Sequence, residues 1–437
     1  MRTLLTILLI LTIFVCRAQK QTYEQVDNQT YNSFMEKDFQ TTIKVGNEAI
    51  KEGIDFYFLR YRIGVSYFEI NNYEAAIINL EKAKEFDSND PVLLEYLYYS
   101  YIYTRRNAAA AALLTILPDD LKAKLNHKTP LFESISAEIG LLKTNNFNHN
   151  KNANLKGNNN YAHGTFYSDV VFENIIITNQ INPKLRIQNL FSVVSNTSNN
   201  LFQSALPIER TQIFSNKNNY FQWNSIASYY FKGWDIGVGF GIYKSGYTIY
   251  YPPPPLQPAA PFISTKINTT NFSTSVSLRR KLAYVEPVLA ITYTDLLNLN
   301  TYSIEGSLHY FPLGNLNFYG NTKIGIVTNE LETNTIFTQL LGLKLSKKIW
   351  LEGYGAIGNH QNYISDNGLF VFNTPNKINW YAGCNLNLYV KSFDFSLGYG
   401  IQERAASFEN GFNSLNTNSI NYTYNYHLLK TKIVWKF

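Results

Sequence analysis

The chain ends in Lys432-Ile433-Val434-Trp435-Lys436-Phe437, and this stretch decides the fold. Side chains alternate across a β-strand, so Ile433, Trp435 and Phe437 fall on one face and the residues between them on the other. The first face is wholly apolar, whereas the second carries two lysines. This pattern is typical of a strand with one face in lipid and the other in a polar lumen. It predicts a transmembrane β-barrel.

A last strand that stops on an aromatic residue resembles the C-terminal signal by which the outer-membrane assembly machinery recognises β-barrel proteins. Phe437 stands at that position. The resemblance implies insertion into the outer membrane of a Gram-negative cell. An amphipathic edge strand of a soluble protein gives the same short alternation, so the prediction depends on the rest of the chain.

The N-terminus indicates export. A positive start at Arg2 precedes an apolar run from Leu4 to Val15, and the small residue Ala18 follows. We expect a secretory signal peptide over residues 1–18. Acylation of Cys16 is the alternative, although Val15 fits poorly before a lipidated cysteine. Removal of the signal leaves a single cysteine, which excludes an intramolecular disulfide.

Composition narrows the class of membrane protein. Only 16% of the 437 residues are charged, Asn is abundant, and the chain carries 33 Tyr and 29 Phe. Helical membrane proteins need apolar runs of about twenty residues, and none follows the signal. Abundant aromatic residues suit the interfacial girdles of a barrel. The net charge of +6 is spread without a basic cluster, so nothing indicates a nucleic-acid partner.

Residues 19–143 carry helical periodicity. The clearest unit runs from Tyr57 to Asp90, where the small residues Gly64, Ala76 and Ala83 allow two helices to approach closely. Its spacing resembles the tetratricopeptide repeat, a helical hairpin of about 34 residues. The positions that carry the resemblance are Ile63, Gly64, Tyr67, Ala76, Leu80 and Ala83.

Two further units are less regular. One begins at Pro91 and has Tyr98 where Gly is usual, and the other precedes Tyr57 and has Gly46 in place of a large residue. We expect Leu131 to Lys143 to form an amphipathic helix that caps the stack. The resemblance implies an α-solenoid that presents a concave surface to a protein or peptide. A generic bundle of helical hairpins explains the same spacing and stays open.

The second half of the chain changes period. Residues 144–160 are rich in Asn and lack periodic apolar residues, which predicts a flexible linker. From residue 161 to the end the period is two, most clearly over 234–243, 272–279 and 393–402. Strands of about 10 to 15 residues, joined by alternately short and long connections, favour a barrel over a soluble sandwich.

The connections predict the topology. Thirteen strands can be counted, and a periplasmic C-terminus together with a periplasmic helical domain requires an even number. We therefore expect a fourteenth strand within 150–162, with twelve strands as the alternative. Short turns are expected near Asn182-Pro183, Lys232-Gly233, Arg280-Lys281, Gly314-Asn315, Lys347-Lys348 and Lys391-Ser392. Long loops are expected near 196–216, 251–268, 296–300, 329–334, 361–376 and 404–420.

One expected loop is rich in proline, with Pro252 to Pro255 followed by Pro258 and Pro261. Such a run forms a stiff polyproline II rod without donors for a strand ladder. It predicts either a ligand for a partner or an extracellular loop stiffened against pairing and proteolysis.

Candidate catalytic residues are few. Ser307 and His309 share one face of a predicted strand, as a Ser/His pair does in outer-membrane phospholipases, but no third residue orients the base. The six histidines form no spaced metal pair, so we expect neither metal nor cofactor. Cys384 falls on the apolar face. Charged residues expected to line the lumen are Arg279, Glu286, Glu305, Lys323, Lys344 and Glu352.

The sequence thus predicts an α + β multidomain chain, with a solenoid of tetratricopeptide-like hairpins at 19–143 and an outer-membrane barrel of about 14 strands at 161–437. Proteins that resemble this combination tend to be accessory parts of secretion, assembly or export machines. That implies a barrel that anchors a periplasmic scaffold for a protein or peptide. The alternatives are a channel for solute or polysaccharide and an enzyme that acts on lipid or polysaccharide.

Overall fold

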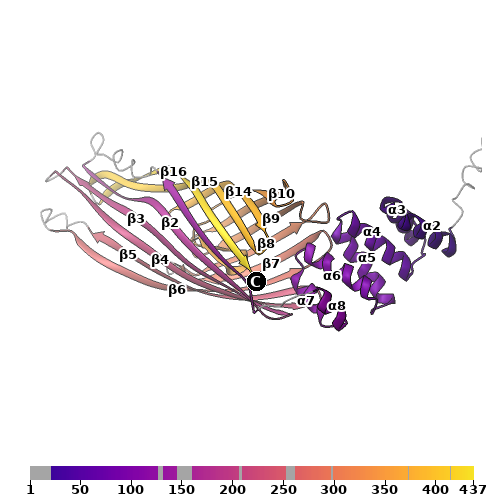
Figure 1. Cartoon of the computed structure of the whole chain (residues 1–437). Helices are drawn as coiled ribbons and strands as arrows, with labels where there is room; N and C mark the ends of the chain where they lie inside the picture. The colour runs from indigo at the N-terminus through magenta and orange to yellow at the C-terminus, as the bar shows by residue number, and fades with distance from the viewer. Residues whose placement is uncertain are drawn as a thin grey trace, which may run out of the picture. The chain divides into compact units, whose positions relative to one another are not determined.

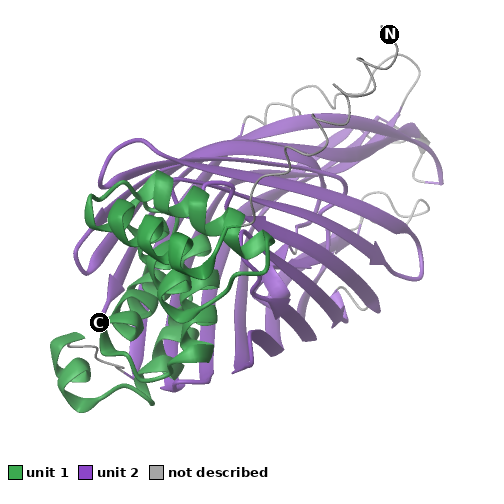
Figure 2. Cartoon of the chain, turned by 90° about the vertical axis from the view of Figure 1, so that its right-hand side faces the viewer, with its two compact units in different colours: residues 1–127 green, residues 128–437 purple. Residues whose placement is uncertain are grey.

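The computed structural model describes residues 21–125, 131–144, 160–205, 209–251, 261–296, 299–372, 374–413 and 415–437. The chain divides into two compact units, residues 1–127 and 128–437, which Figure 2 colours separately. The signal peptide predicted at 1–18, most of the predicted linker and most of the proline-rich loop lie outside the described residues.

Three helical hairpins and a further helix make up the described part of the first unit. The first helices of the hairpins begin at Tyr23, Tyr57 and Pro91, 34 residues apart. This is the spacing that the repeat resemblance implies, although assignment to that repeat family stays a prediction. None of these helices is long and apolar enough to cross a membrane. The hairpins are α2 (Tyr23–Met35) with α3 (Phe39–Lys51), α4 (Tyr57–Glu69) with α5 (Tyr73–Phe86), and α6 (Pro91–Tyr103) with α7 (Asn107–Leu114), followed by α8 (Asp119–Leu125).

Side-chain caps determine where several helices begin. Asp38, Asn72 and Asp90 each accept a hydrogen bond from a backbone N–H in the first turn of the helix that follows. These N–H groups have no partner within the helix, so a cap stabilises the start by about 1 kcal/mol. Pro91 occupies the first turn of α6, where the missing N–H removes no intrahelical bond.

Small residues set the distance between helices. A Cβ added at Gly64 of α4 would lie 2.7 Å from Cγ of Leu80 on α5, closer than two carbon atoms pack. Ala76 and Ala83 of α5 are fully buried. The close approach produces a continuous apolar core through the later helices. Its buried members are Val65, Ala76, Ile77, Leu80, Ala83, Leu93, Leu94, Leu97, Tyr98, Tyr101, Ala110, Leu113, Leu117 and Leu121.

Ion pairs with at least one buried partner join each helical hairpin to the next. Nη1 of Arg62 on α4 lies 2.7 Å from Oδ1 of Asp27 on α2. Arg106, at the start of α7, pairs with Glu74 of α5, and their side chains are only 9% and 2% exposed. Removing one partner of such a pair leaves an uncompensated buried charge, so each pair fixes how its helices align.

The second unit is a closed barrel of fourteen antiparallel strands, as predicted (Figure 1). Strands that are neighbours in sequence are neighbours in the wall, except that β14 follows β11 after a two-stranded excursion. β1 closes the ring by pairing with β16 on one side and β2 on the other. The wall strands are β1 (Phe132–Thr144), β2 (Tyr161–Asn182), β3 (Leu185–Ser204), β4 (Arg210–Phe231), β5 (Trp234–Tyr251), β6 (Ile263–Arg280), β7 (Val285–Thr294), β8 (Thr301–Tyr310), β9 (Phe318–Thr328), β10 (Thr333–Lys344), β11 (Ile349–Ile357), β14 (Lys377–Val390), β15 (Phe393–Asn413) and β16 (Asn416–Lys436).

The predicted helical cap at Leu131 to Lys143 is wrong, because this segment is strand β1. Ile135, Ile139 and Leu142 recur at helical spacing, but the segment also alternates, with Ile139 exposed between the more buried Glu138 and Gly140. Hydrogen bonding to two neighbouring strands outweighs the local preference. The barrel therefore begins at β1 rather than at residue 161. The fourteenth strand lies at 132–144 instead of within 150–162.

The alternation predicted for the strands is confirmed. On β16, Ile433 is 48% and Trp435 46% exposed, and both face outward. On β5, Val238 is 58% exposed, whereas Gly239 lies on the inward face. A barrel with an apolar outer face and a polar inner face hides its backbone polar groups from lipid by pairing every strand.

The six predicted short turns all join strands at the end of the barrel where the C-terminus lies. Lys232 and Gly233 adopt φ of 47° and 81°, as a two-residue hairpin turn requires. The long loops predicted at 196–216 and 404–420 are wrong, because β3, β4, β15 and β16 continue through most of them. These strand segments are rich in Asn, Ser and Thr, a composition that is typical of loops. In a strand that extends past the apolar band, both faces are free to be polar.

Candidate functional site

The segment between β11 and β14 forms a small hairpin instead of the extracellular loop predicted at 361–376. It consists of β12 (Tyr363–Ser365), a 3-10 turn η3 (Asp366–Gly368) and β13 (Phe370–Phe372). The turn residues Asp366, Asn367 and Gly368 have φ of 54°, 61° and 100°. Asp, Asn and Gly tolerate this left-handed region best, so the local sequence suits the reversal. We call residues 358–376 the lumen hairpin.

The lumen hairpin crosses the inside of the barrel. It leaves the wall between β11 and β14, and its tip contacts β4, where Asn224 Nδ2 donates to the carbonyl of Leu369 at 2.8 Å. Five strands separate β4 from β14 in one direction around the ring, and six separate it from β11 in the other. A segment that reaches β4 therefore spans the lumen from one side to the opposite side.

Small side chains on the facing wall receive the tip. Ser275 Oγ on β6 donates to the carbonyl of Asn367 at 2.8 Å. Gly237, Gly239 and Gly241 of β5 face the same space, and a Cβ at any of them would collide with a neighbouring side chain. Leu369 packs on Leu190 of β3 and Ile226 of β4, with Ile176 and Phe370 beside them.

A cluster of charges holds the other side of the tip. Lys323 of β9 forms an ion pair with Asp366 of the hairpin and lies 3.9 Å from Oε1 of Glu305 on β8. The hydroxyl of Tyr363 donates to Glu305. Lys323 and Glu305 have side chains only 12% and 7% exposed. Charges shielded from water need partners, so the cluster fixes the hairpin to the wall.

The base of the hairpin is anchored separately. His360 is fully buried, with Nδ1 2.7 Å from the carbonyl of Gly358. Its ring packs against Phe372 and Tyr381. On the returning limb, Asn376 Nδ2 donates to the hydroxyl of Tyr424 on β16 at 2.8 Å. The base and the tip therefore depend on different contacts.

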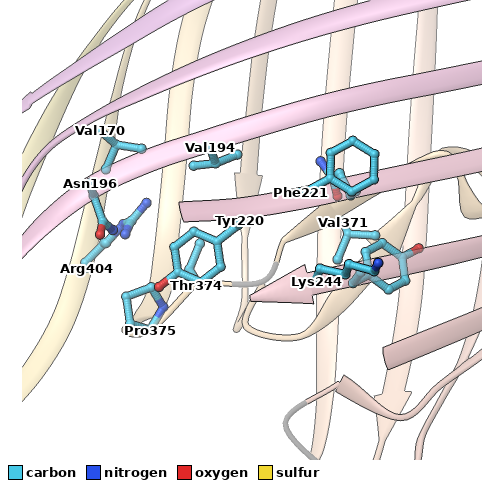
Figure 3. A pocket seen from close by; sticks show the side chains of 12 residues that line it. Val170, Val194, Asn196, Tyr220, Phe221, Lys244, Val371, Thr374, Pro375 and Arg404 are labelled. Carbon is cyan, nitrogen blue, oxygen red and sulfur yellow. The ribbon is translucent and has the colours of Figure 1, made fainter. Parts of the chain in front are cut away.

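Cavities lie beside the returning limb. One of about 310 Å³ is bounded by Thr374 and Pro375 and by inward residues of β2, β3, β4 and β5. A smaller one of about 70 Å³ lies where Tyr220, Pro375 and Arg404 gather in Figure 3. A third of about 530 Å³ shares Tyr167 and Pro375 with the first, so the two adjoin. The hairpin thus leaves space within the lumen.

The predicted lumen charges face inward, as expected. Among them Glu286 is 6% exposed and lies 3.8 Å from Arg279, and Glu352 accepts a hydrogen bond from the hydroxyl of Tyr319 at 2.6 Å. Lys344 lies over the ring of Trp350 at 5.0 Å. These charged side chains therefore already interact with other side chains of the barrel wall.

Ser307 and His309 lie on the inward face of β8, but no hydrogen bond joins them among the described residues. Glu286 stands opposite His309 in the strand register and is paired with Arg279 instead. A nucleophile needs its base within hydrogen-bond reach. No group of three metal-ligating side chains occurs in the described part of the chain. Cys384 is exposed on the outward face, as predicted.

Sequence reasoning missed the lumen hairpin, although the sequence holds a signal for it. Asn367-Gly368 is a strong hairpin turn pair and stands between two short apolar runs, 363–364 and 369–372. The polar residues around the runs favoured a loop. Only the pairing partners across the lumen distinguish an inward hairpin from a surface loop.

The closed ring of strands, the apolar outer face and the polar lumen define the chain as an outer-membrane β-barrel with an N-terminal helical unit. No protein-family model and no curated protein matches it.

Solved outer-membrane barrels resemble its fold. The toluene transporter TodX of Pseudomonas putida is 9% identical, covers 75% of this chain and 91% of its own, and gives a TM-score of 0.42. A FadL homologue of Pseudomonas aeruginosa is 8% identical over 70% of this chain and 90% of its own, with a TM-score of 0.43. The translocator domain of the autotransporter NalP of Neisseria meningitidis is 9% identical over 77% and 99%, with a TM-score of 0.30. Likenesses of this size carry no argument about function.

Proposed function

We propose that the barrel is an outer-membrane channel for a polar solute and that the lumen hairpin closes it at rest. The observation that carries this proposal is the hairpin itself, a segment that spans a polar lumen and touches both sides. A barrel that serves only as an anchor needs no segment across its interior.

The contacts of the hairpin tip suit a closure that can open. Two hydrogen bonds, the Lys323 cluster and the packing of Leu369 hold it. Each polar partner can be replaced by water once the tip moves, so the cost of opening falls mainly on the apolar contact of Leu369 with Leu190 and Ile226. The base, anchored through His360 and Asn376, would stay in place during such a movement.

The helical unit then acts in the periplasm, where it docks a protein or peptide. Its supports are the hairpin spacing of 34 residues and the register of β1, whose first residues pair with the last residues of β16. The chain therefore enters the barrel at the end of the short turns, which is the periplasmic end in outer-membrane barrels. A scaffold within an export machine remains the competing function, in which the barrel only anchors this unit.

Conductance in planar bilayers separates the two functions. We expect small, infrequent currents from the wild-type protein. A variant with residues 361–374 replaced by a short Gly-Ser linker is expected to conduct continuously. Lys323→Ala leaves Glu305 and Asp366 without their cation and is expected to open more often. Asp394→Asn, which removes a 2.7 Å ion pair with Lys436, is the matched control and is expected to behave as wild type.

Heat-modifiable migration on gels establishes that each variant is a folded barrel. A folded linker variant that conducts no ions would contradict the channel and favour the anchoring scaffold.

A further inference from the structure

We propose that the cavity of about 310 Å³ beside the lumen hairpin binds a neutral saccharide. The inference names the solute class of the proposed channel and rests on that function for its role, although binding itself requires no conduction. Small-ligand sites have volumes of roughly 300–1,000 Å³, so this cavity with its neighbour holds one or two sugar rings. We call it the tyrosine cavity.

Aromatic rings supply the first recognition element. Tyr167, Tyr220, Tyr247 and Tyr250 line the tyrosine cavity from β2, β4 and β5. A pyranose ring has an apolar C–H face and a polar edge, so it suits a surface that offers rings with polar tips. A tyrosine side chain has only two torsion angles, so each ring loses little conformational freedom on binding.

Amide and hydroxyl groups supply the second element. Asn218 Nδ2 donates to Asn196 Oδ1 at 2.9 Å and to Ser198 Oγ at 3.1 Å. Thr165 Oγ1 donates to Asn200 Oδ1 at 2.7 Å. Such a network offers donors and acceptors side by side, as the hydroxyl groups of a sugar require.

Unused donors lie within and beside the cavity. The hydroxyls of Tyr220 and Tyr247 make no hydrogen bond with another described residue. Asn216, 9% exposed, accepts from the hydroxyl of Tyr250 at 2.8 Å, yet its Nδ2 has no partner among the described residues. A buried amide without a partner is costly, and a ligand hydroxyl would relieve that cost.

The residues that line the tyrosine cavity disfavour an ionic ligand. None of the fourteen described residues that line the tyrosine cavity is Asp, Glu, Lys or Arg. The nearby cation Arg404 belongs to the small neighbouring cavity and lies over the ring of Tyr426 at 4.5 Å. The larger adjoining cavity carries one charge of each sign, Lys377 and Glu409, and so offers no net counter-charge. An ionic ligand would enter a poorly hydrated space without a counter-charge, which is unfavourable. A neutral, polyhydroxylated ligand matches the lining better than an acidic or apolar one.

The site is coupled to the hairpin. Thr374 and Pro375 of the returning limb form one wall of the tyrosine cavity and also bound the small one. A saccharide that fills the cavity therefore contacts the segment that closes the lumen. Binding is expected to change how often that segment opens.

Saturation-transfer difference NMR on the full-length protein tests the site. The protein is kept in lauryldimethylamine oxide, a detergent without a sugar headgroup, and maltose, cellobiose and diacetylchitobiose serve as neutral probes. At least one is expected to give a saturable signal, whereas glucuronate and toluene give none. Tyr220→Ala is expected to weaken binding roughly tenfold through the lost ring contact. Tyr220→Phe keeps the ring and is expected to lose much less.

Tyr229→Ala is the matched control, because Tyr229 lies on the same strand and faces outward with 44% exposure. Heat-modifiable migration establishes that each variant is folded. Binding of toluene without any sugar, equal loss in Tyr220→Ala and Tyr229→Ala, or no signal from any sugar would overturn the site. A protein that binds sugar but carries no current across a planar bilayer would contradict the channel and leave the sugar site standing. A protein that conducts but binds no sugar would contradict the sugar site and leave the channel standing.

Discussion

Gly64 and Lys323 represent two constraints that act on single residues of this chain. Gly64 lies where α4 and α5 touch, and its lack of a side chain allows Leu80 to pack against the helix backbone. Lys323 lies where the lumen hairpin meets the wall, and its charge balances two carboxylates. The first position has a steric requirement, and the second has an electrostatic one.

Gly64→Leu is expected to destabilise the helical unit. Four added carbon atoms cannot fit against Leu80, and overpacking of this kind costs about 1–3 kcal/mol of unfolding free energy. Chemical denaturation of a fragment covering residues 19–127, followed by circular dichroism, measures the loss. Glu85→Leu, at a side chain 65% exposed on α5, is the control and is expected to change stability little. A wild-type fragment without helical structure, or equal stability in both variants, would count against the close helix packing.

At the scale of elements, β16 unites the features that made the barrel predictable. Its alternation is strict near the C-terminus, and Trp435 lies within 4.3 Å of Phe437 and 6.1 Å of Phe393, measured between ring centroids. This aromatic group faces outward at the end of the short turns. It matches the girdle that such barrels place at a membrane interface.

Trp435→Asp is expected to lower the amount of barrel in the outer membrane. A charge on the lipid face near an interface costs only about 0–1 kcal/mol, so the larger effect is expected at recognition by the assembly machinery, which the terminal aromatic pattern resembles. Western blots of membrane fractions, with and without heating, measure the level of folded barrel. Val434→Asn places a polar side chain on the inward face of the same strand without setting a second carboxylate opposite Asp394, and normal levels are expected. Equal levels in both variants would show that the outward aromatic face is dispensable.

Two elements, β1 and the lumen hairpin, could not be predicted correctly from the sequence, and the reasons are physical. β1 has apolar residues at both helical and strand spacing, and only its pairing with β2 and β16 decides between them. The lumen hairpin has the turn residues of any surface hairpin, and its inward direction depends on Asn224, Ser275 and Lys323, which are remote in sequence. By contrast, local alternation alone predicted which faces of the wall strands meet lipid.

The tyrosine cavity could not be predicted from the sequence for a similar reason. The inward polarity of β3 and β4 is visible in alternate Asn, Ser and Thr residues, but the same residues favour a loop at 196–216 when the sequence is considered alone. The closed ring brings them to Tyr247 and to Pro375 of the hairpin. Each site residue is unremarkable in its own strand, and the site exists only after the barrel closes.

For the whole molecule, the orientation in the membrane decides which partners each unit can meet. The six predicted short turns lie at one end of the barrel, together with the start of β1 and the C-terminus. The opposite end carries connections of mixed length, including the four residues 329–332 between β9 and β10. Outer-membrane barrels place short turns in the periplasm. If this chain follows that rule, the loop after β9 faces the outside and the helical unit faces the periplasm.

Single cysteines in a Cys384→Ala background test this orientation on intact cells with a membrane-impermeant thiol reagent. A cysteine at Leu331, 78% exposed in the loop after β9, is expected to react at once. A cysteine at Asn89, exposed between α5 and α6, is expected to react only after the outer membrane is breached. A cysteine at Asn367 reports on the lumen and is expected to react more slowly than Leu331, because the tip of the hairpin packs against β6. Labelling at Asn89 with Leu331 silent would invert the orientation, and the helical unit would then meet extracellular partners.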